Sequence, residues 1–256
     1  EDTVKGIKYG AGNGNAALKN VSSIQDLGNH RVKITYSSKA SEVQNGMCFQ
    51  SRPTVRDHAG TFFWKSKDIT MTSLDIHFLH GFGMVGQHSE NITMDDVDFE
   101  APKESGRTTA GYADFVQMSG CKGTINISNC TFAGPHDDPI NIHGTFNTVT
   151  AISSDRRTIT VQYNHNETAG FPNFFEGDEI EFMTKGNMIT VEDSVRTVTK
   201  VDGPDGMGGN MGEGSGSLTT INLTLDKAIP ADVQVNQHVV ENITYTPAVN
   251  ISNCEF

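Results

Sequence analysis

Positive charge is scarce in this chain of 256 residues, which carries 19 Lys and Arg against 31 Asp and Glu, for a net charge of −12. Such a surface repels polyanions, so a nucleic-acid partner is excluded, and a polyuronate is disfavoured unless a local basic cleft receives it. The chain also lacks any run of about 18 consecutive apolar residues, so we expect no membrane span. Apolar residues nevertheless make up 36% of the sequence, enough for a folded globular protein.

Cysteine is scarce as well, and none of Cys48, Cys121, Cys130 and Cys254 belongs to a CxxC pair. A zinc site is therefore not expected, and the sequence predicts no metal site. Four cysteines permit disulfides without requiring them. The sequence starts at Glu1 without a charged and then apolar leader, and secretion stays open.

Four eight-residue segments share one pattern of apolar positions. They cover 69–76 (ITMTSLDI), 92–99 (ITMDDVDF), 125–132 (INISNCTF) and 249–256 (VNISNCEF). Positions 1, 3, 6 and 8 are apolar in every copy. Positions 1 and 3 alternate as in a β-strand, and the change of phase before position 6 indicates a corner.

The spacing of these copies predicts an all-β fold, a right-handed parallel β-helix in which each repeat forms one rung. The first two copies begin 23 residues apart and the next two 33, with 124 residues before the last. The larger spacings indicate a loop in one rung and an inserted subdomain in another. We expect a second strand before each copy, in TFFWKSKD, GMVGQHSEN, DFVQMSGCKGT and HVVEN.

Stacked rungs bury like residues on like residues. Cys130 and Cys254 are therefore interpreted as small apolar fillers of one column rather than as a disulfide or redox pair. The triplets that match the glycosylation pattern begin at Asn91, Asn126, Asn242 and Asn250. Because these triplets recur in the repeats, we interpret their asparagines as corner residues with positive φ.

The pattern changes over 146–237, where short alternating runs such as TITVQY and TTINLTL lie between Gly, Asp and Asn. This pattern predicts an antiparallel β-barrel-like subdomain inserted between rungs, with a flexible loop at 203–217. We expect four parts: N-terminal strands or the remnant of a preceding β subdomain at 1–45, rungs with the active site at 46–145, the inserted subdomain at 146–237 and a returning rung at 238–256. In the first part, NAALKNVSSIQDL suggests a short helix and RVKITYSS a strand.

Three carboxylates are expected to meet on neighbouring rungs. Aligning ADFVQM with DDPINI places Asp114 against Asp138, 24 residues later, with Asp137 beside them. Adjacent parallel strands lie about 4.8 Å apart, so the three groups cannot all ionise cheaply, and one should keep its proton. Glycoside hydrolysis by an acid and a base needs that division of labour.

The surroundings favour chemistry over the alternatives, which are a Ca²⁺-binding ladder and a solvated turn. His136 and His143 bracket the Asp pair in HDDPINIH, and Asn141 lies between them. All three suit sugar hydroxyls or the tuning of a carboxyl pKa. Gly83 holds the equivalent place on the preceding rung, where the missing side chain would leave room for a ligand.

AGYADFVQMSGCKG and FAGPHDDPINIHGT resemble glycoside hydrolase family 110, the inverting α-1,3-galactosidases that act on blood-group-B-type glycans. GTFFWKSKDITM, LHGFGMVGQHSENITMDDVDF, GFPNFFEGDEIEF and ENITYTPAVNI extend the resemblance from about Gly46 to the C-terminus. ADF, SGCKG and HDDPINIHGT follow one another in the family's order and spacing. The family's β-helix with inserted β-barrels agrees with the repeat analysis. The polygalacturonases of family 28 are more distantly similar.

The resemblance implies a role for each carboxylate. Asp137 would be the general acid, while Asp114 and Asp138 would hold and deprotonate the attacking water. An inverting enzyme keeps its acid and base carboxyls about 6.5–9.5 Å apart. Which member of the pair at 137 and 138 is the acid stays open.

The same region supplies candidates for substrate binding. They are His136, Asn141, His143, Arg107 and Arg52. His143 would contact the sugar or tune a pKa. Arg52 and Arg56 would reach the mouth of the cleft, with a surface salt bridge as the alternative.

We therefore expect exo-acting removal of terminal α-1,3-linked galactose from an oligosaccharide or glycoconjugate, with inversion and without cofactor or metal. Two alternatives stay open: another β-helix polysaccharide hydrolase or lyase of the polygalacturonase type, and a non-catalytic glycan-binding β-helix. A secreted or periplasmic location in a bacterium is expected, and the oligomeric state stays open. Because family members are much longer, the chain is expected to be a central portion of a larger enzyme.

Overall fold

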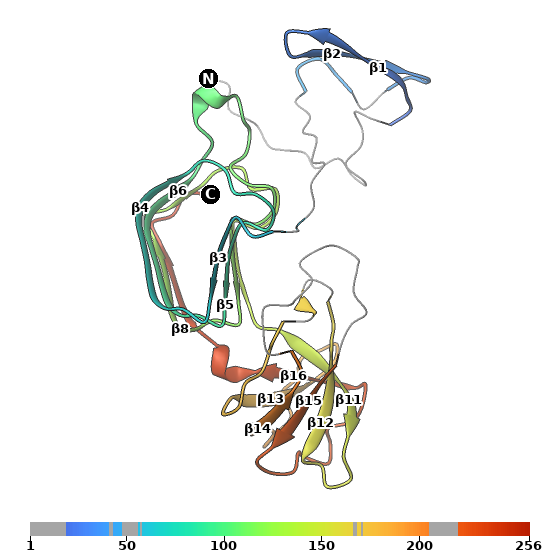
Figure 1. The fold of residues 1–256 in the computed structure, drawn as a ribbon, viewed down its shortest axis with the longest axis vertical. Coiled ribbons are helices and arrows are strands. Elements are labelled where there is room, and N and C mark those ends of the chain that lie inside the picture. The colour runs from blue at the N-terminus through green and yellow to red at the C-terminus, as the bar shows by residue number, and fades with distance from the viewer. Residues whose placement is uncertain are drawn as a thin grey trace. The chain divides into compact units, whose positions relative to one another are not determined.

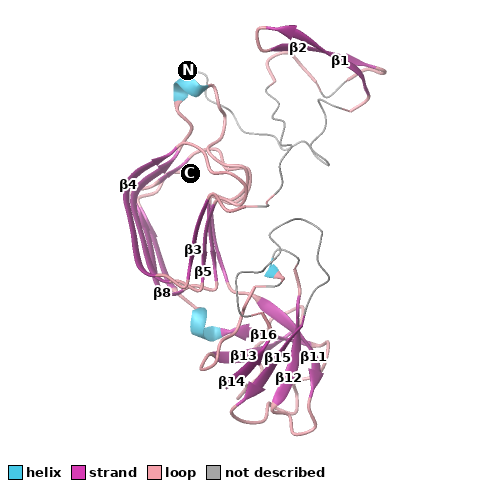
Figure 2. Ribbon diagram, in the orientation of Figure 1, coloured by secondary structure: helices cyan, strands magenta, loops and turns pink. Residues whose placement is uncertain are grey.

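The computed structural model describes residues 19–40, 43–47, 56, 58–165, 168–169, 171–204 and 220–256. The chain divides into two compact units, 1–53 and 54–256. β-strands dominate both units, as Figure 2 shows, so the all-β prediction is confirmed. No helix among the described residues is long and apolar enough to cross a membrane. Most of the expected loop at 203–217 lies outside the described residues.

The first unit contains an antiparallel hairpin of β1 (Val21–Gly28) and β2 (Arg31–Tyr36). Asn29 and His30 connect the strands with φ of 52° and 57°, conformations that match a two-residue turn to the twist of its strands. The strand expected in RVKITYSS is confirmed. The helix expected in NAALKNVSSIQDL is wrong over its described part, because that part pairs with β2 along its length.

The second unit contains two parallel sheets that enclose one hydrophobic core (Figure 1). The four-stranded sheet has the order β10 (Ile140–His143), β7 (Val116–Ser119), β5 (Met84–Gln87), β3 (Thr61–Trp64). The five-stranded sheet has the order β17 (Ala248–Ser252), β8 (Lys122–Ser128), β6 (Glu90–Phe99), β4 (Lys67–Ile76), and β9 (Thr131–Phe132) pairs with β6. One turn of 3₁₀ helix, η1 (Lys103–Ser105), lies between β6 and β7.

The chain alternates between these sheets, since β3, β5 and β7 lead directly into β4, β6 and β8. Like positions of the repeats pair across strands. Ile92 lies opposite Ile69 on one side and Ile125 on the other, and Met94 lies opposite Met71. The predicted alignment of the repeats is therefore confirmed.

The fifth position of every repeat forms the predicted corner. Ser73, Asp96, Asn129 and Asn253 have φ of 53°, 57°, 55° and 52°. This left-handed step, which Asn and Asp tolerate better than most residues, turns positions 6 and 8 toward the core. The corners also bond to one another, because the Ser73 hydroxyl donates to Asp96 Oδ2 at 2.7 Å.

The asparagines of the glycosylation-like triplets occupy several different places. Asn91 has a φ of 56°, as predicted. Asn126 and Asn250 lie inside strands, where Nδ2 of Asn250 donates to Oδ1 of Asn126 at 2.9 Å. Asn242 accepts a hydrogen bond from the Thr244 amide and caps η3 (Ile243–Tyr245). The corner interpretation is wrong for Asn126 and Asn250, because the corner falls three positions later in the repeat, and for Asn242, because it ends the barrel strand β16.

Position 8 forms a column of stacked aromatic rings. The ring centroids are 5.1 Å apart between Phe99 and Phe132, and 5.4 Å apart between Phe132 and Phe256. Cys130 and Cys254 are free thiols packed in or against the same core. Their interpretation as column fillers is therefore confirmed.

A closed antiparallel barrel of six strands encloses a second core (Figure 1). Its order is β11 (Phe146–Ile152), β12 (Thr158–Tyr163), β15 (Thr220–Leu225), β14 (Arg196–Asp202), β13 (Glu179–Thr184), β16 (His238–Asn242). The predicted barrel is confirmed. HVVEN, expected as a strand of the returning rung, is β16 instead, because Val240 lies opposite both Asn147 and Phe182.

His88 connects the sheets to the segment that leads into the barrel strand β13. Its Nε2 lies 2.6 Å from the carbonyl oxygen of Pro172, and its ring stands edge-on to Phe175 and Tyr245. Burial lowers the pKa of His88 to about 4. The imidazole is therefore neutral at neutral pH and donates its Nε2–H to the carbonyl.

Gly83 marks the closest approach between two rungs. Its φ is 79°, and a Cβ at this position would meet the backbone oxygen of Asp114 at 1.9 Å. The expectation that Gly83 leaves room for a ligand is therefore wrong, because the backbone of the next rung occupies that space.

Replacing Gly83 by Ala is expected to lower the free energy of unfolding by about 2–4 kcal/mol, since backbone strain and a backbone clash add. Fluorescence of the sole tryptophan, Trp64 in β3, reports unfolding of the sheets in urea. Gly106→Ala is the control, because Gly106 has a φ of 67° but nothing within 4 Å of a Cβ. It should cost only about 1–2 kcal/mol, and equal losses in the two variants would contradict the clash.

Candidate active site

The outward face of the four-stranded sheet carries two of the predicted site residues, Asn141 and His143. Val116 and Met118 of β7 belong to the core, as do Ile140 and Ile142 of β10. Side chains alternate along a strand. Gln117, Asn141 and His143 therefore lie on the opposite face, and Gln117 is paired with Asn141 in register.

The predicted contact between the two Asp-bearing segments is present. Val116 lies opposite Ile140. Just before these strands, the Phe115 amide donates to the Asp138 carbonyl oxygen at 3.0 Å, and the Val116 amide donates to that of Pro139 at 3.2 Å. The parallel register thus makes the backbones of Asp114 and Asp138 neighbours on adjacent segments of the sheet.

Asp114 is the buried carboxyl of the group, with only 3% of its surface exposed. Nδ2 of Asn141 donates to its Oδ2 at 3.3 Å. Burial raises the pKa of Asp114 above its ordinary value, and the charges of Asp137 and Asp138 raise it further, while the Asn141 hydrogen bond and the Arg56 charge oppose this. Asp114 is therefore the carboxyl of the group most inclined to hold a proton.

Asp137 is exposed and forms an ion pair with Arg56. The guanidinium carbon of Arg56 also lies 5.2 Å from the centroid of the Phe82 ring, a cation–π contact. The sequence predicts Arg56 at the mouth of the cleft or in a surface salt bridge. The fold pairs it with Asp137, which lies 81 positions later in the chain.

His143 has both ring nitrogens engaged with protein groups. Nδ1 lies 2.7 Å from the carbonyl oxygen of Gly144, which can only accept, so Nδ1 carries a hydrogen. Nε2 lies 2.6 Å from Nε2 of Gln117, which donates. The ring is therefore held by the backbone and by Gln117, a residue that the sequence did not single out.

The remaining predicted residues lie in the loops. Half-buried His136 directly precedes Asp137, and Asp138 is exposed. The guanidinium carbon of Arg107 lies 5.2 Å from the centroid of the Phe78 ring. Arg52 lies outside the described residues.

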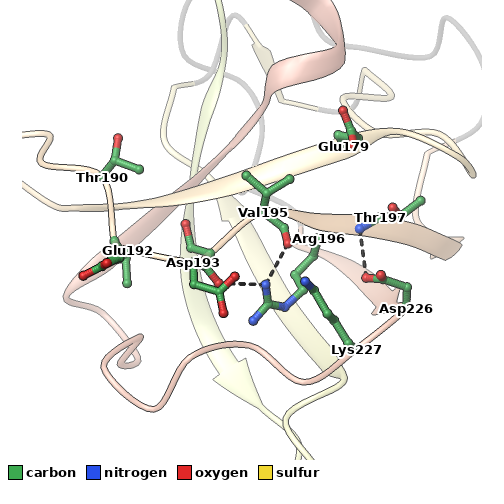
Figure 3. Close-up of a pocket in the computed structure, with 11 residues that line it drawn as sticks. Glu179, Thr190, Glu192, Asp193, Val195, Arg196, Thr197, Asp226 and Lys227 are labelled. Atoms are coloured by element: carbon green, nitrogen blue, oxygen red, sulfur yellow. Dashed lines mark hydrogen bonds between the residues drawn. The ribbon is translucent and has the colours of Figure 1, made fainter.

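A hollow of about 360 Å³ lies elsewhere, on the barrel (Figure 3). Arg196 borders it and is only 4% exposed. Its guanidinium donates to the carbonyl oxygens of Asp193, Val195 and Ala228. Because these bonds join the segments before β14 and after β15, Arg196 has a structural role there. None of the predicted site residues lines this hollow.

The chemistry available to the Asp cluster is acid–base chemistry. It holds one buried carboxyl, one carboxylate paired with Arg56 and one exposed carboxylate. No group of three or more His, Cys, Asp and Glu side chains has metal-binding geometry within the part of the chain that the structure describes. Two carboxyl groups of different protonation, with water, are what glycoside hydrolysis requires.

Known proteins similar to this chain match both the barrel and the parallel sheets of the second unit. Residues 158–204 match the family model described as GLAA-B beta-barrel domain II, a range that contains β12, β13 and β14. The chain is 46% identical over 242 residues to a protein of Streptomyces avermitilis named alpha-1,3-galactosidase A. Proteins of the same name from Peterkaempfera griseoplana and Bacteroides thetaiotaomicron are 44% and 38% identical over 229 residues.

These matches cover most of the chain but a minor part of each relative. They span 94%, 88% and 88% of this chain, and 38%, 31% and 38% of the respective relatives. The chain thus spans about a third of the length of the curated relatives it matches. The match to the Streptomyces protein covers 242 of the 256 residues, so it includes Asp114, Asp137 and Asp138.

The burial of Asp114 predicts that its ionised carboxylate lowers the free energy of unfolding at neutral pH. Because its pKa is raised, Asp114 binds a proton more tightly in the folded state than in the unfolded state. The free energy of unfolding of the wild type therefore falls as the pH rises from 3.8, the ordinary pKa of an Asp side chain, through the pKa of Asp114 in the folded state. Asp114→Asn removes the buried charge. It is expected to raise the midpoint of thermal unfolding at pH 7 by about 2–4 °C, the shift that about 1 kcal/mol produces.

The gain should shrink as the pH falls toward 3, where Asp114 is protonated in both states. Asp138→Asn is the matched control, because that carboxylate is exposed and its loss should change the midpoint little. A midpoint lowered at pH 7 by Asp114→Asn would contradict the burial argument.

Proposed function

We propose that this chain carries the active site of an α-1,3-galactosidase that removes terminal galactose from an oligosaccharide or glycoconjugate. The observation that carries the proposal is the 46% identity, over 94% of the chain, to a protein named alpha-1,3-galactosidase A. The cluster of Asp114, Asp137 and Asp138 supports it independently, because it supplies carboxyl groups in unlike environments. We further propose membership of glycoside hydrolase family 110.

The fold proposed for the catalytic part is a right-handed parallel β-helix. Support comes from the regular alternation of the chain between two parallel sheets and from the pairing of like repeat positions. The barrel, whose last strand is β16, would then be a subdomain inserted at 146–242, with rungs at 46–145, a returning rung that contains β17 and the remnant of another β subdomain at 1–45. A secreted or periplasmic bacterial location suits an enzyme that meets glycans outside the cell.

The proposed mechanism is a single displacement with inversion. One carboxylic acid protonates the glycosidic oxygen as the bond to C1 breaks, while a carboxylate takes a proton from the water whose oxygen attacks C1 from the opposite face. The α-linked substrate thereby yields β-galactose and the shortened glycan. No cofactor or metal is needed, and Asn141, His136, His143, Arg107 and Arg52 are proposed around the sugar.

The identity of the acid has two sources of support that disagree. The resemblance implies Asp137 as the acid, with Asp114 and Asp138 holding the water. Asp137 is paired with the Arg56 guanidinium, whereas burial raises the pKa of Asp114 and favours its protonated form.

Product stereochemistry tests the reaction class. The full-length protein is expected to release galactose from an α-1,3-galactobioside, with the β-anomer appearing first in proton NMR spectra. Initial α-galactose would refute inversion. Binding without turnover would favour a glycan-binding protein, and chelator-sensitive cleavage of a polyuronate would favour a lyase.

Leaving-group dependence identifies the acid. α-Galactosyl fluoride needs little protonation of its leaving group, whereas the galactobioside needs a general acid. The Asn variant of the true acid is expected to lose about 10²–10⁴-fold on the galactobioside but less than about tenfold on the fluoride. Asp137→Asn and Asp114→Asn are compared on both substrates. A variant that loses activity equally on the galactobioside and on the fluoride has lost the residue that deprotonates the attacking water.

A further inference from the structure

Gln117 is held in the sheet in a way that leaves one of its polar atoms without a partner. The residue is 8% exposed and lies on the outward face of β7. Its Nε2 donates to His143 Nε2 at 2.6 Å. Its Oε1 is buried and accepts no hydrogen bond from the residues that the structure describes.

A buried acceptor without a donor destabilises a folded protein, and native structures contain few of them. The amide is fixed from its other end, because His143 Nδ1–H donates in turn to the Gly144 carbonyl oxygen. The chain of bonds from Gly144 through His143 thus sets the position of the Gln117 side chain. The Oε1 of Gln117 is therefore held in a fixed orientation and can still accept a hydrogen bond.

This acceptor lies on the same face as the carboxyl cluster. The register partner of Gln117 in β10 is Asn141, whose amide donates to Asp114 at 3.3 Å. Both ring nitrogens of His143 are already engaged. The unused hydrogen-bonding capacity of this pair therefore resides in the Gln117 oxygen rather than in the imidazole.

We infer that Gln117 determines substrate specificity by accepting, at Oε1, a hydrogen bond from a hydroxyl group of the galactose bound at the Asp cluster. This inference rests on the proposed function. Asp114 is itself only 3% exposed, so a sugar that reaches its carboxyl has to open this face of the sheet. The same opening gives access to the neighbouring Gln117.

The test combines substrates that lack one hydroxyl with a variant that lacks the acceptor. Nitrophenyl α-galactoside is compared with its 2-deoxy, 3-deoxy, 4-deoxy and 6-deoxy analogues in the full-length protein. One analogue is expected to lose about tenfold or more in kcat/KM through loss of this bond. In Gln117→Met the same analogue should lose less than about twofold relative to the parent galactoside.

Gln87→Met is the matched control. The Oε1 of Gln87 is also buried without a partner, but Gln87 pairs with Ser119 in register, a row further along the strands from Asp114. Gln87→Met should keep the wild-type ratio of kcat/KM between the parent galactoside and the deoxy analogue. Gln117→Glu, which retains an acceptor oxygen, should also keep that ratio, and Gln117→Leu, which lacks the acceptor, replaces Gln117→Met if that variant fails to fold.

Each outcome separates the two proposals. In one outcome the wild type releases galactose, while the ratio of kcat/KM between parent and deoxy analogue is the same in the wild type and in Gln117→Met. That result overturns the role of Gln117 and leaves the proposed function standing. An equal change of ratio in the Gln87 and Gln117 variants also overturns it. A wild-type protein that neither cleaves these galactosides nor binds galactose in calorimetry overturns both.

Discussion

The pairing of like positions on successive rungs is the constraint on which the rest of the second unit depends. Each apolar residue of a repeat sits on its counterpart, from the Ile69–Ile92–Ile125 column to the stacked rings of Phe99 and Phe132. Burial of these columns stabilises the sheets in proportion to the apolar area removed from water. A slip by one residue would turn every column to the wrong face, so the register is strongly specified.

The same register produces the candidate site. Segments that enter β7 and β10 are hydrogen-bonded neighbours, so Asp114 and Asp138 share adjacent rungs although 24 positions separate them. Core packing therefore fixes where negative charges meet, against their mutual repulsion. Arg56 and Asn141 offset part of that cost, each by contact with a different carboxyl group.

Much of this arrangement follows from the sequence because it is periodic. The repeat predicts the columns, the corner and the alignment of Asp114 with Asp138. Features that depend on particular contacts were missed or misassigned. Gly83 was expected to leave open space, but a turn of the backbone fills it. HVVEN has the pattern of a rung strand, and only its two barrel neighbours show otherwise.

The site residues missed by sequence reasoning share one property, which is that their partners are distant in the chain. Nothing near Arg56 in sequence indicates that it meets Asp137. Gln117 was part of the aligned strand ADFVQM, and alternation with its buried neighbours could have placed it beside Asn141. Its bond to His143 depends on side-chain rotamers, which periodicity does not specify.

The barrel has a consequence for the order in which the chain folds. Asn126 and Asn250 are bonded neighbours although 124 positions separate them, and pairing across such a distance is slow. Once the barrel has formed, β11 and β16 lie side by side and bring together the two points where the chain leaves and re-enters the sheets. The effective loop then shrinks to a few residues at each end. We therefore expect the barrel to form before β17 pairs with β8.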